Sequence, residues 1–212
     1  NVLPYFDLPL QHSHPDILRA MNRPWQENIN SSLFNRIRDQ LPDAVLRTSL
    51  IVGFPGEEES HFEHLLQFIQ SHTFDHIGAF IFSPEDGTEA VKLSNPVPYE
   101  LAQARMDHLI SIQQPIAEEK NKKCIGSILD ILIEKKDPHT ENLIGRCARF
   151  APEVDGEVFL KVGTDKSDMQ IGMMVPALIT GGDTYDLYAE ASDMSSIVKS
   201  VKESNEIKNF DE

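Results

Sequence analysis

The chain has 212 residues, of which 40% are hydrophobic, and a formal net charge of −15 at pH 7. This length and composition allow one large globular domain or two smaller ones, whereas so acidic a chain disfavours nucleic-acid binding unless basic residues cluster locally. The sequence shows no signal peptide and no apolar run of the roughly 20 residues that span a bilayer, and its two cysteines cannot build a disulfide framework, so we expect a cytoplasmic protein.

The first part of the chain, residues 1–123, alternates short apolar strands with helical stretches, as is typical of a parallel sheet with crossover helices. We expect strands at 4–10, 45–52 and 76–82, and helices at 15–21, 30–41 and 57–71. The strand at 45–52 is largely apolar, so we expect it to be buried on both faces. A long helix should follow the connection at 83–98, and Pro115 predicts that this helix breaks into two segments.

The second part of the chain has short strands separated by turn residues. We expect these strands at residues 127–135, 142–150, 157–161, 173–180 and 186–191. Five such strands indicate a small β-barrel over residues 124–191. Residues 192–212 are polar and lack a clear apolar stripe, so they predict a weak helix or a disordered tail.

Several short segments stand out by their order and spacing. They are Tyr5-Phe6-Asp7-Leu8-Pro9-Leu10-Gln11-His12, Met21-Asn22-Arg23-Pro24, Ile51-Val52-Gly53-Phe54-Pro55-Gly56-Glu57, Phe82-Ser83-Pro84-Glu85-Asp86-Gly87-Thr88 and Gln113-Gln114. Together they resemble the radical-SAM methylthiotransferases. The resemblance implies an α/β plus all-β fold, with the second half of a TIM-like radical-SAM barrel at residues 1–123 and an OB-like, five-stranded TRAM β-barrel at 124–191.

The resemblance also implies cofactors, namely S-adenosyl-L-methionine (SAM) and two 4Fe–4S clusters. In the family each cluster is held by three cysteines, but this chain has only Cys124 and Cys147, which we expect to be buried core residues. The chain also begins at Asn1 with a strand-like stretch. We therefore expect a carboxyl-terminal fragment that is inactive alone and contains no catalytic or metal-binding residue.

The Gly53-Phe54-Pro55-Gly56 turn follows a predicted strand, where glycine lets the backbone approach a ligand closely. Taken alone, these residues favour a tight turn into the next helix over a ligand-binding role. The resemblance implies cofactor-binding roles for Gln11, His12, Arg47, Gly53, Phe54, Pro55, Gly56 and Glu57. For Gln11 and His12 an ordinary strand end is the alternative. Arg47 could pair with a carboxylate of SAM or of the substrate, or lie exposed at the start of its strand.

Two branches of the family share this architecture. One modifies an adenosine of tRNA, and the other modifies the β-carbon of an aspartate in ribosomal protein S-twelve. Between Cys124 and Glu190 the chain has 12 acidic and 6 basic residues, which repels tRNA phosphates and suits a basic ribosomal protein. Residues 149–156 and 185–187 also resemble the ribosomal-protein branch. We therefore predict the aspartate-modifying enzyme, with substrate contacts at Glu153, Asp155 and Asp186, although each is equally typical of turn or barrel-surface chemistry.

Other functions remain open at this point. The tRNA-modifying branch is one, and a non-catalytic acidic adaptor that binds a basic partner through the barrel is another. An ordinary α/β hydrolase is disfavoured because the sequence has no Gly-x-Ser-x-Gly elbow and no metal-binding histidine pair. We expect neither a nucleic-acid nor a membrane partner.

Overall fold

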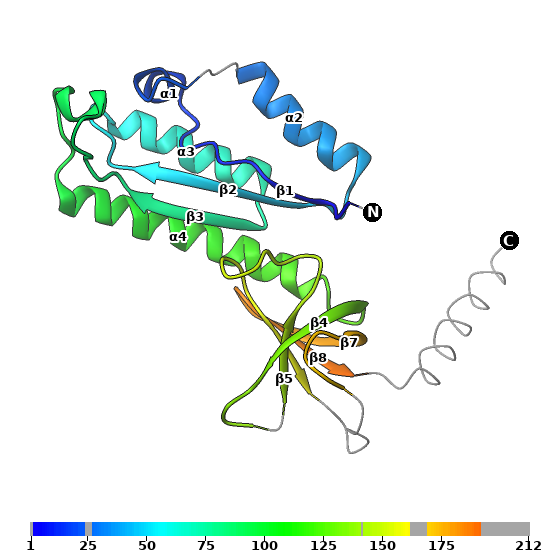
Figure 1. Ribbon diagram of the computed structural model, residues 1–212. Coiled ribbons are helices and arrows are strands. Elements are labelled where there is room, and N and C mark those ends of the chain that lie inside the picture. Colours follow the sequence, from blue (N-terminus) through cyan, green and yellow to red (C-terminus); the bar gives the residue numbers. More distant parts are fainter. Residues whose placement is uncertain (1, 24–26, 141, 162–168, 192–212) are drawn as a thin grey trace, which may run out of the picture. The chain divides into compact units, whose positions relative to one another are not determined.

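The computed structural model describes residues 2–23, 27–140, 142–161 and 169–191 (Figure 1). The chain divides into two compact units, Asn1–Lys120 and Asn121–Glu212, and each is described by itself. No helix in the described ranges is long and apolar enough to cross a membrane. The tail predicted at residues 192–212 lies outside the described residues.

The first unit contains a three-stranded parallel sheet in the order β1-β2-β3 (Figure 1). Its elements are β1 (Tyr5–Asp7), α1 (Pro15–Ala20), α2 (Glu27–Gln40), β2 (Val45–Val52), α3 (Glu59–His72), β3 (His76–Ile81), the short 3-10 helix η1 (Glu89–Lys92) and α4 (Tyr99–Lys122). Parallel strands connected through helices confirm the predicted α/β class.

The core of this unit lies on one face of the sheet. Leu50 and Val52 of β2 pack with side chains of α3 and α4, and Leu46 packs with Phe34 of α2 and with the end of α3. Arg47, Ser49 and Ile51 of β2 point the other way and are only partly buried. The prediction that this strand is buried on both faces is therefore wrong, because α2, α3 and α4 all contact the same face.

Helix α4 is continuous through Pro115, so the predicted break is wrong. Pro115 and Ser111, the residue one turn earlier, both lie on the exposed side of the helix. A proline removes the hydrogen bond to the carbonyl four residues before it, but on this side water can bind that carbonyl. The helix still buries Leu109 and Gln113 on its opposite side.

The second unit is a closed β-barrel with the strand order β4-β5-β6-β8-β7, which confirms the predicted five-stranded barrel. Its strands are β4 (Ile128–Lys136), β5 (Leu143–Arg146), β6 (Val158–Lys161), β7 (Met174–Gly182) and β8 (Leu187–Ala191). All neighbouring pairs are antiparallel except β6 and β8. Cys147 is buried in the barrel core, as predicted, whereas Cys124 is only partly buried and packs against that core.

Candidate functional site

The turn after β2 is shaped by two glycines. Gly53 and Gly56 have φ angles of 77° and 83°, in the left-handed region that glycine adopts without strain. A Cβ atom on Gly53 would lie 2.5 Å from the Cβ of Ala102 in α4, whereas a Cβ on Gly56 would meet nothing within 4 Å. Close packing of the turn against α4 therefore requires glycine at position 53. The sequence had suggested a different reason, the approach of a ligand.

A buried carboxylate holds this turn from inside. One oxygen of Glu57, Oε2, accepts hydrogen bonds from the backbone N–H groups of Gly53 at 2.7 Å and Phe54 at 3.3 Å. The other, Oε1, accepts from Nη1 of Arg105 in α4 at 3.0 Å, and this arginine side chain is only 5% exposed. Burial raises the pKa of Glu57, although Arg105 and the two N–H groups act in the opposite direction. Any influence of Glu57 on a ligand is therefore exerted through the turn.

Two cavities adjoin the turn. The larger has a volume of about 470 Å³ and is mostly apolar, with Gly53 and Pro55 in its wall. The smaller has a volume of about 330 Å³ and is lined by Gln11 and Phe54, among others. Phe82 lines both cavities and packs edge-to-face on Phe54, with ring centroids 5.0 Å apart. Both volumes lie in the range of small-molecule sites.

The smaller cavity combines apolar rings with hydrogen-bonding groups. Its polar lining residues are Gln11, Asn22, Arg23, Thr88 and Glu89, and the side chains of Ile51, Phe54 and Phe82 supply apolar surface. Such a mixture suits a ligand that carries both a flat ring and charged groups. The sequence interpretation did not assign a role to Arg23, although this residue belongs to one of the segments that carried the resemblance.

Gln11 is held in an unusual backbone conformation at this cavity. Its φ angle is 73°, which is uncommon for a residue other than glycine. Its N–H donates to the carbonyl of Ser49 at 2.8 Å, and its own carbonyl accepts from the N–H of Ile51 at 2.7 Å. Strained residues of this kind cluster at functional sites. The predicted cofactor-binding role of Gln11 thus agrees with where the residue lies, and it remains a prediction.

His12 lies behind the site, since its side chain is fully buried and it lines neither cavity. Its Nδ1 accepts a hydrogen bond from the N–H of His14 at 2.9 Å, so the neutral ring carries its hydrogen on Nε2. Burial, followed by the nearby histidines 14, 61 and 64 and by Arg105, lowers the pKa of His12 to about 3. His12 is therefore neutral near pH 7 and has no direct access to a ligand in either cavity.

Arg47 lies at the opposite end of β2 from the turn. Gly53 follows it by six positions, which corresponds to about 20 Å along an extended strand. Its Nη1 donates to the carboxylate of Asp7 on the neighbouring strand at 2.9 Å. The structure does not bring Arg47 together with the turn, and the arginine that lines the smaller cavity is Arg23.

In the barrel, two of the three residues predicted to contact substrate hold turns. Asp155 accepts a hydrogen bond from the N–H of Ala151, and Asp186 accepts one from the N–H of Glu157, both at 2.8 Å. Burial raises the pKa of Asp186. The third, Glu153, is exposed. These placements do not test a substrate contact, but they give Asp155 and Asp186 a structural role.

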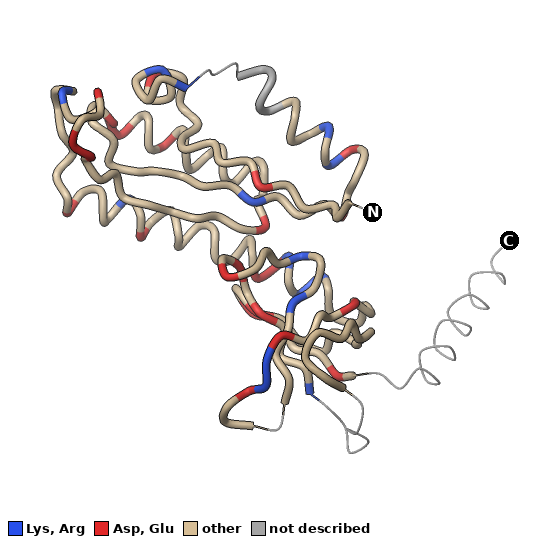
Figure 2. The backbone as a smooth tube through the Cα atoms, in the orientation of Figure 1, with Lys and Arg blue, Asp and Glu red and all other residues tan. Residues whose placement is uncertain are grey.

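Acidic and basic residues are interspersed along the barrel strands (Figure 2). Three of its cations are paired with acidic side chains at 2.6 to 3.0 Å: Lys135 with Glu157, Arg146 with Glu134, and Lys161 with Glu190. The sequence between Cys124 and Glu190 has twice as many acidic as basic residues, 12 against 6. The excess charge of the barrel is therefore negative.

Comparison with known proteins gives matches for both units. The TRAM domain family matches residues 125–191. The chain is 60% identical over 187 residues to the ribosomal protein uS12 methylthiotransferase RimO of Parasynechococcus marenigrum (strain WH8102), covering 88% of this chain and 40% of that protein. It is 61% identical over 188 residues to the protein of the same name from a strain of Prochlorococcus marinus, and this match covers 88% of this chain and 43% of that protein. It is 56% identical over 204 residues to the protein of the same name from Synechococcus sp. (strain RCC307), and this match covers 96% of this chain and 42% of that protein. The chain thus spans about two-fifths of the length of these relatives.

Proposed function

This chain belongs to the RimO family of methylthiotransferases, and we propose that it forms part of an enzyme that adds a methylthio group to the β-carbon of an aspartate in ribosomal protein uS12. Because the chain spans about two-fifths of its relatives, we assign the activity to a longer cytoplasmic protein to which this chain contributes two units. The observation that carries the proposal is 55–61% identity to proteins of that name over 88–96% of the chain.

The smaller cavity beside the turn is the proposed SAM site. Phe54 and Ile51 offer apolar surface to the adenine ring, Gln11 and Asn22 offer hydrogen-bonding groups, and Arg23 offers a cation for the carboxylate of the methionine part. Glu57 and Arg105 keep the turn in place beneath Phe54. When bound, SAM supplies the methyl group and, together with an iron–sulfur cluster, the radical chemistry that opens an unactivated C–H bond.

The two 4Fe–4S clusters do not fit the residues of this chain. A cluster of this kind is held by several cysteine thiolates, but the chain has two cysteines, both in the barrel unit. Burial raises the pKa of Cys147, which disfavours its thiolate. We propose that the clusters are held by other parts of the longer protein, and we expect the isolated chain to be inactive.

For the barrel we propose a role in binding the basic uS12 polypeptide. Its negative excess charge favours encounter with a cationic partner and disfavours the phosphates of tRNA. Of the predicted contact residues, Glu153 is exposed and free to meet a partner's cation, whereas Asp155 and Asp186 also hold turns. A tRNA substrate is the competing outcome, and tRNA binding with a steep salt dependence would support it.

The SAM site can be tested in this chain by measuring SAM affinity with equilibrium dialysis. Replacing Arg23 with alanine should weaken binding about tenfold, because one charge-assisted hydrogen bond contributes roughly 1.4 kcal/mol. The matched control is Arg19→Ala, since Arg19 is 77% exposed in α1 and pairs with Asp16. Equal affinities for the two variants would contradict the assignment of this cavity.

A further inference from the structure

Four histidines gather where α1 and α3 begin. The ring of His14 lies 4.3 Å from the ring of His61 and 5.2 Å from that of His64, measured between centroids. His12 lies behind them, close enough for the other three histidines to lower its pKa. The cavity proposed to bind SAM is lined by none of these four histidines, and the proposed reaction does not use them.

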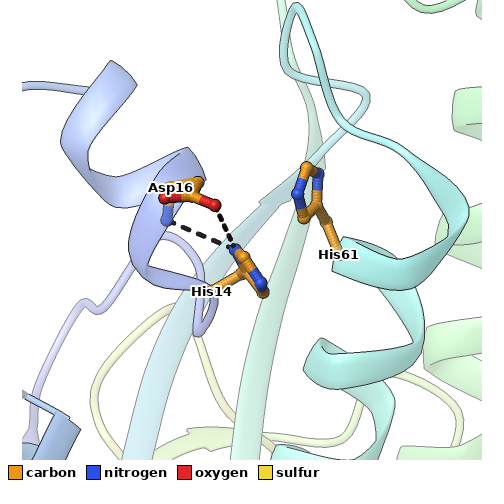
Figure 3. Close-up of side chains that lie close together, drawn as sticks. All are labelled: His14, Asp16 and His61. Carbon is orange, nitrogen blue, oxygen red and sulfur yellow. Dashed lines mark hydrogen bonds and ion pairs between the residues drawn. The ribbon is translucent and has the colours of Figure 1, made fainter.

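Three residues of this region are arranged as ligands of one ion. His14 and Asp16, at the start of α1, face His61 at the start of α3 (Figure 3). Each offers one ligand atom, and these atoms all lie within 4.8 Å of one another. We propose that His14, Asp16 and His61 bind a divalent transition-metal ion of the Zn²⁺ class.

The distances require only a small adjustment. Zinc lies about 2.0–2.2 Å from nitrogen and oxygen ligands, so two ligands of a tetrahedral ion lie roughly 3.4 Å apart. Nδ1 of His14 and Oδ2 of Asp16 are 3.9 Å apart, which is about 0.5 Å longer than that separation. The three ligand atoms lie within 4.8 Å of one another, so they need to approach by up to about 1.4 Å, which rotation of the partly exposed His61 ring and the exposed Asp16 side chain can supply.

The ligand atoms can be released from their present contacts. Asp16 binds Arg19 through Oδ1 at 2.7 Å, which leaves Oδ2 facing His14. Nδ1 of His14 accepts from the N–H of Asp16 at 3.2 Å, and Nδ1 of His61 accepts from the N–H of Glu58 at 3.0 Å. Both hydrogen bonds lie in exposed surroundings, where water can replace the ring nitrogen as partner for the N–H. Metal binding therefore competes with these contacts, which moderates its affinity.

The other two histidines are poorly placed to act as ligands. Nδ1 of His12 accepts from the N–H of His14, which leaves a hydrogen on its fully buried Nε2. Nδ1 of His64 is hydrogen-bonded to Oγ of Ser13 at 2.9 Å. The site thus has three protein ligands and leaves a further coordination position to water.

The ligand set determines the class of ion. Two imidazoles and one carboxylate suit Zn²⁺ and its first-row neighbours, whereas Ca²⁺ and Mg²⁺ prefer oxygen ligands alone. The negative charges of Asp16 and Glu58 offset the unfavourable effect of two helix amino-terminal ends on a cation. A bound ion would join α1 to α3, which are about 40 residues apart in the sequence, independently of any SAM chemistry.

The test is isothermal titration of the 212-residue chain with ZnCl₂, with MgCl₂ and CaCl₂ as comparisons. We expect one Zn²⁺ per chain and at least tenfold weaker binding for His14→Ala and for His61→Ala. His108→Ala, on the exposed side of α4, is the matched control and should bind like the parent chain. Replacement of Zn²⁺ by Co²⁺ should give visible absorption bands that both histidine variants lose.

Because His14 also caps α1, the variant Asp16→Asn provides a second test that leaves the histidine cap in place. It removes the anionic ligand and should weaken Zn²⁺ binding while the circular dichroism spectrum stays that of the parent. The proposal is overturned by the absence of Zn²⁺ binding, by binding that persists in both histidine variants, or by binding that is lost only when Cys124 and Cys147 are blocked.

Discussion

The pair of Arg105 and Glu57 makes the sharpest prediction about stability. Replacing Arg105 with alanine removes the hydrogen bonds to Oε1 and to the carbonyl of Glu57, while the carboxylate stays buried. The arginine also contacts Glu59, but that carboxylate is 67% exposed and adds little. Because an uncompensated buried charge costs about 3–5 kcal/mol, we expect the free energy of unfolding to fall by roughly that amount at neutral pH.

The loss should depend on pH in a definite direction. Burial already raises the pKa of Glu57 above its ordinary value of 4.5, and removal of Arg105 should raise it further. A carboxyl group with a raised pKa holds its proton in the folded state where the unfolded chain has released it, so the folded state regains stability as the pH falls. The destabilisation by Arg105→Ala should therefore be smaller near pH 5 than near pH 8.

Urea unfolding followed by the helical circular dichroism signal measures both effects. Lys92→Ala is the matched control, because Lys92 also forms an ion pair, with Glu89 at 2.6 Å, but its side chain is 69% exposed. This control should cost less than about 1 kcal/mol. Similar losses of stability in the two variants would contradict this role of Arg105, as would a loss for Arg105→Ala that does not shrink at the lower pH.

Two further pairs of measurements test the turn and the core. Gly53→Ala should destabilise the chain by about 3 kcal/mol, because its Cβ would lie 2.5 Å from that of Ala102. A Cβ on Gly56 would meet no neighbouring atom, so Gly56→Ala should lower the free energy of unfolding by about 1 kcal/mol, for its positive φ alone. Equal urea midpoints for the Gly53→Ala and Gly56→Ala variants would contradict this account. Asp75→Asn should cost about 2 kcal/mol at neutral pH. Burial raises the pKa of Asp75, but Lys120, the Leu46 N–H and Arg38 lower it by more, so that the pKa in the folded chain lies below its ordinary value. The cost of Asp75→Asn should therefore vanish as the pH falls below about 4, and a cost that does not depend on pH would contradict this role of the carboxylate.

Much of the fold follows from local patterns in the sequence. The strand at Val45–Val52 has its predicted bounds, and five barrel strands lie close to the predicted ranges. The predictions that are wrong concern how the elements pack against one another, which a local sequence pattern does not show. Apolar content could not show that β2 has its helices on one face only, and Pro115 is tolerated because its side of α4 is exposed.

The site was predictable only where neighbouring residues form it. The turn at Gly53 carries its own signature, whereas Arg105 binds Glu57 across 48 positions of sequence, and no local spacing indicates that contact. The cluster of His14 and His61 likewise depends on how α1 and α3 pack. For Arg47 the signal was available, since its place near the start of β2 already implies distance from the turn.

The proposed function is that this chain forms part of an enzyme that modifies uS12. The most direct measurement is mass spectrometry of uS12 and tRNA after incubation with the full-length protein, reconstituted with iron and sulfide and supplied with SAM and a reductant. We predict that one aspartate-containing peptide of uS12 gains the mass of a methylthio group less one hydrogen, and that tRNA stays unmodified. A methylthio group found on tRNA, with uS12 unchanged, would contradict the account.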